Sequence, residues 1–201
     1  MSTAIDLNGV AIWKSLIDRG QQKALTDALR RVAEHAPFRQ YETPGGQRMS
    51  VRMSGAGQAA WMSDRLGYRY AALQPNGESW PEIPGQLLEI WRTVSGVARD
   101  PDTCLVNFYG PGTKMGMHQD KDEADLSWPV VSISLGDDAL FRVGGSRRGG
   151  KTQSIWLASG DVAVLAGKAR LHHHGIDRIK SGSSTLLPKG GRLNVTLRVA
   201  G

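Results

Sequence analysis

Cysteine is almost absent from this 201-residue sequence: Cys104 is the single one, so no disulfide can form within the chain. We therefore expect a reducing compartment, and the apolar run around Cys104 favours a buried packing role over a reactive thiol. No stretch reaches the roughly 18 apolar residues of a membrane-spanning helix. The first residues also lack the charged and then apolar layout of a signal peptide. These absences predict a cytoplasmic protein with no membrane partner.

Aromatic residues are few, at 6% of the chain, whereas the 25 glycines are frequent and gather in short clusters between apolar runs. This pattern favours an all-β or α+β domain with many turns over a helical bundle. The length fits one domain, residues 1–201. The net charge of +6 and the sequence pI near 9.7 are compatible with a polyanionic partner, although charge alone identifies none.

Apolar periodicity predicts amphipathic helices over residues 22–34 and from about Pro84 to Val94. From Cys104 onward, short apolar runs alternate with turn residues and predict a β-sandwich or barrel. These runs are Cys104–Tyr109, Val130–Leu135, Leu140–Val143, Ser154–Leu157, Asp161–Leu165 and Arg192–Val199. Residues 38–80 contain many glycines and aromatics, and fit equally a hairpin layer that caps the core and a mobile lid over a pocket.

The motif His118-Gln119-Asp120 places an imidazole and a carboxylate at positions i and i+2, which share one face of a strand. Two such ligands are two thirds of the facial triad that leaves three coordination positions open on Fe(II). The run His172-His173-His174 offers a third ligand, or it is a surface tract. Strand alternation puts His172 and His174 on the same face, so the pattern does not choose between them.

The last predicted strand alternates strictly, with Arg192, Asn194, Thr196 and Arg198 on one face. This face either meets solvent or lines the interior of a barrel. In an interior, the two guanidinium groups need anionic partners, because an unpaired buried charge is very costly. A dicarboxylate ligand would supply them, and Asn107 and Tyr109 form another i, i+2 pair that could hydrogen-bond to the same ligand.

Several motifs occur together in a fixed order. They are Pro37-Phe38-Arg39-Gln40, Thr43-Pro44-Gly45-Gly46, Asn107-Phe108-Tyr109-Gly110-Pro111-Gly112, His118-Gln119-Asp120-Lys121-Asp122, Ser132-Ile133-Ser134-Leu135-Gly136, His174-Gly175-Ile176 and the pair Arg192 and Arg198. Together they closely resemble the AlkB family of bacterial DNA-repair dioxygenases. The likeness extends from about Pro37 to Val199, which is most of the chain.

The resemblance implies a mainly β (α+β) fold: a double-stranded β-helix (jelly-roll) catalytic core over about 104–200, flanking N-terminal helices, and a nucleotide-recognition lid over about 40–80. It implies Fe(II), 2-oxoglutarate and O2 as cofactor and co-substrates. By position, it makes His118, Asp120 and His174 the catalytic iron ligands and so decides between the histidines. The residues that it assigns to 2-oxoglutarate are Asn107, Tyr109, Arg192, Asn194 and Arg198, with Arg198 expected at the distal carboxylate.

On the substrate side, the resemblance matches Trp61 and Tyr68 to aromatic residues of the lid, Asp122 to the acidic residue beside the alkylated base, and Arg148 to a basic residue that contacts substrate. It implies oxidative dealkylation of bases such as 1-methyladenine and 3-methylcytosine, mainly in single-stranded DNA, with double-stranded DNA and RNA as further substrates and no obligate protein partner. Leu165, His172 and His173 depart from the family pattern, which bears on the width of the pocket.

Two other functions stay open at this point. One is a 2-oxoglutarate dioxygenase that acts on RNA, protein or a small molecule. The other is a basic β-domain that binds nucleic acid without catalysis, although such a module needs neither iron ligands nor an arginine pair on one strand.

Overall fold

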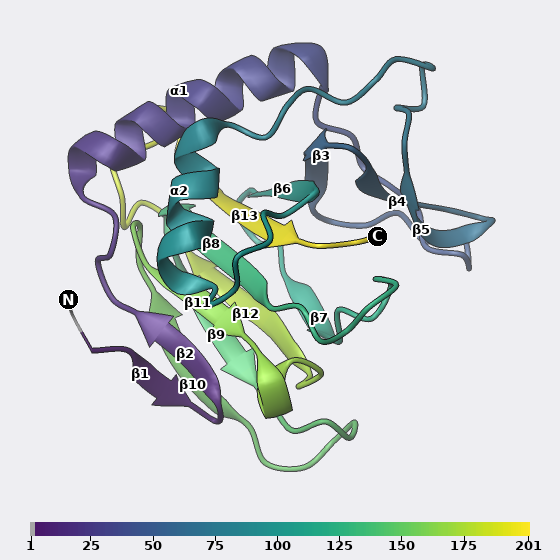
Figure 1. Ribbon diagram of the computed structural model, residues 1–201. Helices are drawn as coiled ribbons and strands as arrows, with labels where there is room; N and C mark the ends of the chain where they lie inside the picture. The colour runs from purple at the N-terminus through teal and green to yellow at the C-terminus, as the bar shows by residue number, and fades with distance from the viewer. Residues whose placement is uncertain (1–2) are drawn as a thin grey trace.

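The computed structural model describes residues 3–201 and shows a mainly β protein with two α-helices (Figure 1). The helices are α1 (Arg19–His35) and α2 (Gly85–Val94), and a short 3-10 helix spans Gly167–Ala169. The strands are β1 (Ile5–Leu7), β2 (Val10–Trp13), β3 (Arg52–Gly57), β4 (Ala60–Asp64), β5 (Gly67–Ala71), β6 (Thr103–Tyr109), β7 (Met115–His118), β8 (Val130–Gly136), β9 (Asp138–Val143), β10 (Gln153–Leu157), β11 (Val162–Leu165), β12 (His174–Lys180) and β13 (Arg192–Arg198).

The strands form two antiparallel sheets that pack face to face as a jelly roll. The major sheet has the order β1-β2-β11-β8-β13-β6-β3, and the minor sheet has the order β10-β9-β12-β7. Apart from the consecutive pairs β1–β2 and β9–β10, neighbours in both sheets are not consecutive in sequence, so the sheets form only when distant parts of the chain come together. The predicted jelly-roll fold is therefore confirmed.

Both helices cover the outer face of the major sheet (Figure 1). Helix α1 begins at a capping box, in which Asp18 accepts from the Gln21 backbone N–H and the Gln21 side chain accepts from the Asp18 N–H. Its apolar stripe, with Leu25 and Leu29, packs with Trp91 of α2 against the sheet. The predicted helices at 22–34 and after Pro84 are thus confirmed.

Strand β13 lies in the middle of the major sheet and is buried on both faces. Leu193, Val195 and Leu197 face the helices as part of the outer core. The alternate residues face the interior between the sheets, where Arg192 is 0% exposed and Arg198 is 5% exposed. The solvent-facing alternative for the two arginines is therefore wrong.

Residues 40–80 divide into two parts with different structural roles. Strand β3 pairs with β6 along its whole length and so belongs to the major sheet. Strands β4 and β5 form a separate two-stranded hairpin that projects from the body of the molecule (Figure 1). Of residues 40–80, only β3 is part of the two main sheets, and the lid stays a prediction. None of the helices within residues 3–201 is both long and apolar enough to span a membrane.

Candidate metal and co-substrate site

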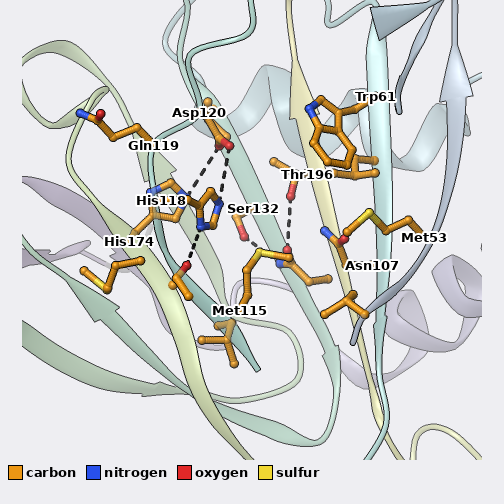
Figure 2. Close-up of a pocket in the computed structure, with 18 of the residues that line it drawn as sticks. Met53, Trp61, Asn107, Met115, His118, Gln119, Asp120, Ser132, His174 and Thr196 are labelled. Carbon is orange, nitrogen blue, oxygen red and sulfur yellow. Dashed lines mark hydrogen bonds and ion pairs between the residues drawn. The ribbon is translucent and has the colours of Figure 1, made fainter. Parts of the chain in front are cut away.

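Two imidazoles and one carboxylate converge inside the jelly roll (Figure 2). His118 ends β7, His174 begins β12, and the two residues are direct partners in the pairing of these strands. Asp120 lies two residues beyond β7, and its carboxylate is 3.8 Å from His118 Nε2 and 3.7 Å from His174 Nε2. One ligand atom of each residue lies within 4.8 Å of the others. Strand β7 ends at His118, so Asp120 lies just outside it, yet the two side chains meet as their i, i+2 spacing predicted.

Each histidine is oriented through its other ring nitrogen. His118 Nδ1 donates to the Gly116 carbonyl at 2.9 Å, and His174 Nδ1 donates to the His172 carbonyl at 3.0 Å. A carbonyl can only accept, so these bonds place the proton on Nδ1 and leave the Nε2 lone pairs directed at the cluster. This arrangement is common for metal-ligating histidines.

The other two histidines of the triple run have different partners. His172 Nδ1 lies 3.0 Å from the Asn8 carbonyl, in the turn between β1 and β2, and His173 Nδ1 lies 3.2 Å from the Gly145 carbonyl. Strand β12 begins only at His174, so strand alternation does not apply to His172. Within the part of the chain that the structure describes, His174 alone of the three joins the cluster.

The electrostatic state of the cluster suits a cation. Burial by itself raises the pKa of Asp120, but the positive charge of Arg198 and the neighbouring imidazoles hold it well below its ordinary value. Burial, together with the proximity of His118, lowers the pKa of His174 to about 4. At neutral pH the site therefore presents an ionised carboxylate and a neutral His174 imidazole, the protonation states that metal binding requires.

The cluster opens into a cavity of about 840 Å³ between the two sheets. The residues expected to hold 2-oxoglutarate all line it: Asn107, Tyr109, Arg192, Asn194 and Arg198. However, Arg198 Nη2 lies 3.0 Å from Asp120 Oδ1, so this arginine lies at the metal end of the cavity. This contact contradicts the expectation that Arg198 occupies the distal end, and Arg192 lies six residues away along β13.

Arg192 makes the cavity fit a carboxylate. Its guanidinium donates to Ser134 Oγ at 2.8 Å and to two backbone carbonyls, and within residues 3–201 it forms no ion pair. Burial lowers its pKa to about 10, which leaves it charged at neutral pH. Its Nε is buried without a hydrogen-bond partner in the described chain, as are Nε and Nη1 of Arg198. Such groups are costly unless a ligand satisfies them, so the residues present fit an anionic co-substrate.

The residues predicted to contact substrate meet at the mouth of the same cavity. Trp61 of β4 stacks on Tyr68 of β5, with ring centroids 5.5 Å apart and an angle of 18° between the rings. Trp61 Nε1 also donates to Asp122 Oδ2 at 2.9 Å. Arg148 lies on the loop between β9 and β10, and all four residues line the cavity. The β4–β5 hairpin is thereby joined to the loop that carries Asp120.

A buried network of polar and charged side chains next to Asp120 was not predicted from the sequence. Glu123 accepts from the Tyr70 hydroxyl at 2.7 Å and from Arg170 Nη2 at 3.0 Å, and it lies 3.2 Å from Arg198 Nε. Arg170 also donates to the Asp120 carbonyl at 2.6 Å. Glu123 directly follows Asp122, which was predicted, so its position near the site could have been inferred from the sequence. No local pattern indicates that Arg170, 47 residues further along the chain, contacts it.

Two imidazoles and one carboxylate that converge in this way form the facial triad typical of non-haem Fe(II) oxygenases. Comparison with known proteins agrees. The family model described as the 2OG-Fe(II) oxygenase superfamily matches residues 9–198. The alpha-ketoglutarate-dependent dioxygenase AlkB homolog of Caulobacter vibrioides is 51% identical over 193 residues, which cover 96% of this chain and 88% of that protein.

Two further relatives place the chain more narrowly. The solved structure of OsALKBH1 superimposes with a TM-score of 0.79 at 30% identity and covers 97% of this chain and 98% of that chain. The Arabidopsis thaliana protein named DNA N(6)-methyladenine demethylase ALKBH1C is 42% identical over 108 residues, 49% of this chain and 24% of that protein. The chain therefore belongs to the 2OG-Fe(II) oxygenase superfamily and, within it, to the AlkB family. Its cofactor and co-substrates are accordingly Fe(II), 2-oxoglutarate and O2.

Proposed function

We propose that this dioxygenase removes N-linked alkyl groups from bases of the 1-methyladenine and 3-methylcytosine type, mainly in single-stranded DNA, with double-stranded DNA and RNA as further substrates. The observation that carries the proposal is the contact between Trp61 and Asp122 at the mouth of the iron-site cavity. The contact joins an aromatic surface to an acidic group beside the same cavity. The whole of residues 1–201 acts as one catalytic domain in this proposal, in the cytoplasm and without an obligate protein partner.

The cofactor side of the proposal uses the residues already described. His118, Asp120 and His174 would hold Fe(II), while Arg192 would bind the distal carboxylate of 2-oxoglutarate and Arg198 would lie at the metal end. Asn107, Tyr109 and Asn194 would hydrogen-bond to the same molecule. When bound, iron, 2-oxoglutarate and O2 supply oxidation of the N-alkyl carbon, with succinate, CO2 and, for a methyl group, formaldehyde as products.

The chain's own residues would select the alkylated base. A methyl group on adenine N1 or cytosine N3 makes the ring cationic, and both a carboxylate and an aromatic face favour a cation over an undamaged base. The methyl group also blocks pairing, which lowers the energy needed to turn the base out of a helix. Arg148 would contact the phosphate backbone. One relative is named a DNA N(6)-methyladenine demethylase, which supports the removal of N-linked methyl groups from DNA bases as the reaction class.

The direct test is an anaerobic titration of the protein with Fe(II) and 2-oxoglutarate, followed by addition of O2 and methylated single-stranded DNA. We expect stoichiometric formaldehyde and succinate, together with a mass loss of one methylene unit from the oligonucleotide. Succinate that forms without any change in the DNA would favour a different substrate, such as a protein or a small molecule. The non-catalytic alternative instead predicts DNA binding that is indifferent to chelators and to His118→Ala, with no O2-dependent formaldehyde or succinate.

A further inference from the structure

Gln119 lies between two of the three residues proposed to bind iron, yet its side chain points away from them (Figure 2). Its Nε2 donates to the Leu171 carbonyl at 2.6 Å and to the Ser146 carbonyl at 3.1 Å. Both partners are backbone carbonyls, which can only accept, so the amide nitrogen must face them. Gln119 thus uses both of its N–H groups to join three separate segments of the chain.

These segments are the ones whose relative placement decides the shape of the iron site. Leu171 lies at the end of the turn that follows the 3-10 helix, three residues before His174 at the start of β12. Ser146 lies in the β9–β10 loop, which carries Arg148 and whose Gly145 holds His173. The Gln119 amide therefore connects the His118–Asp120 segment directly to the segment that presents the third ligand.

Strand pairing alone does not hold this end of the site. β7 has only four residues, lies at the edge of the minor sheet, and ends at His118. Its pairing with β12 also shifts register between His174 and Ile176. Asp120 lies beyond the paired residues of β7 and β12, and the Asp120 backbone carbonyl accepts a hydrogen bond from Arg170. Side-chain bonds must therefore fix residues 119 and 120, and those of Gln119 are the ones directed at the His174 segment.

We propose that Gln119 is a positioning residue of the metal site, which sets the separation of the His118–Asp120 pair from His174. This inference rests on the proposed iron ligands. Loss of the amide should let the two ligand-bearing segments separate, and the loss of such an outer contact typically weakens metal affinity ten- to hundredfold. Gln119→Leu removes both donors at similar volume. Gln119→Glu instead turns a carboxylate oxygen toward two carbonyl oxygens and should be at least as damaging.

The experiment is titration of the metal-free protein with Co(II), followed through the visible absorption of the bound ion, with the thermal midpoint of the metal-free protein measured in parallel. We expect a ten- to hundredfold weaker Kd for both variants, at a temperature where each is fully folded. Gln119→Asn keeps the amide but shortens its reach, so its Kd for Co(II) should also be weaker. This variant replaces Gln119→Leu in the test if the leucine variant does not fold. Gln58 is exposed, and Gln58→Glu introduces the same charge change as Gln119→Glu. This control should bind Co(II) as the wild-type protein does.

The possible outcomes separate the two proposals. Unchanged Kd values in Gln119→Leu and Gln119→Asn, with or without a lower thermal midpoint, would overturn the positioning role while leaving the iron site intact. A wild-type protein that binds no Co(II) would overturn the proposed iron ligands themselves.

Discussion

The guanidinium of Arg198 lies 3.0 Å from the carboxylate of Asp120, deep between the two sheets. The pair joins the central strand of the major sheet to the loop that follows the edge strand of the minor sheet. Because both groups are buried, each would be costly without the other. The contact keeps Asp120 ionised, and it fixes which of the two arginines of β13 lies near the metal.

The two arginines should therefore differ in what they control. We expect Arg192→Met to weaken 2-oxoglutarate binding by about a hundredfold, because truncation of one partner of a buried charged contact costs roughly 2–5 kcal/mol. Co(II) binding without 2-oxoglutarate should stay within about twofold of the wild-type value. Calorimetric titration of each ligand separately measures both effects.

Arg198→Met provides the contrast. Without Arg198, the burial of Asp120 is no longer offset by its strongest positive neighbour, so the pKa of this carboxylate should rise. Co(II) binding should then fail at a higher pH than in the wild-type protein as the solution is acidified. Equal pH profiles for the two arginine variants would contradict the order of the arginines in the cavity.

Acid should destabilise the metal-free protein in a window set by His174. The pKa of this residue is lowered to about 4 by burial, against an ordinary value of 6.5 when the chain is unfolded. Between these values the unfolded state binds a proton that the folded state does not, so stability falls as the pH falls from 6.5 and the loss is complete below about 4. One pKa unit corresponds to 1.36 kcal/mol, which makes the loss at most about 3 kcal/mol. Urea unfolding of wild-type and His174→Gln proteins across this range should show a shallower slope for the variant.

Gly175 should tolerate no side chain, since it follows His174 where β12 approaches β7. A Cβ atom there would lie 2.6 Å from the Met115 carbonyl oxygen and 2.8 Å from that of Gly116. Gly175→Ala must therefore push β7 and His118 away from His174. We expect a loss of about 1–3 kcal/mol in the free energy of unfolding, together with weaker Co(II) binding.

Gly145→Ala is the matched control for this prediction. A Cβ atom at this position has no neighbour within 4 Å in the described chain. An equal loss of stability and of metal affinity in both alanine variants would contradict the steric explanation.

The sequence predicted the strands whose apolar runs are long and continuous, such as β6, β8 and β13. It did not predict β12, because this strand is largely polar and its pairing is irregular between Ile176 and Arg178. Strand β3 was missed for a similar reason, since its residues 52–57 include two glycines and a serine that indicate a turn when read locally. These strands depend on pairing with distant partners, which a local pattern cannot report.

The part of the candidate site that depends on the alternation of side chains along a strand could be predicted from the sequence. The alternation in β13 correctly gathered Arg192, Asn194 and Arg198 on one face, but the direction of the strand relative to the metal is a property of the assembled sheets. The choice of His174 over His172 likewise depends on where β12 begins, and the sequence pattern alone left it undecided.

The negative charge of Asp122 should matter more for cationic than for neutral lesions. Asp122→Asn keeps an oxygen that can accept from Trp61 Nε1, so the contact with the hairpin survives while the charge is lost. We expect kcat/KM to fall about tenfold for 1-methyladenine and 3-methylcytosine in single-stranded DNA, which corresponds to about 1.4 kcal/mol of lost attraction, and to change little for a neutral etheno adduct. Mass spectrometry of each oligonucleotide, with Asp125→Asn as a control for net charge, measures the difference. An equal fall for cationic and neutral lesions would mean that Asp122 acts through the hairpin and not through its charge.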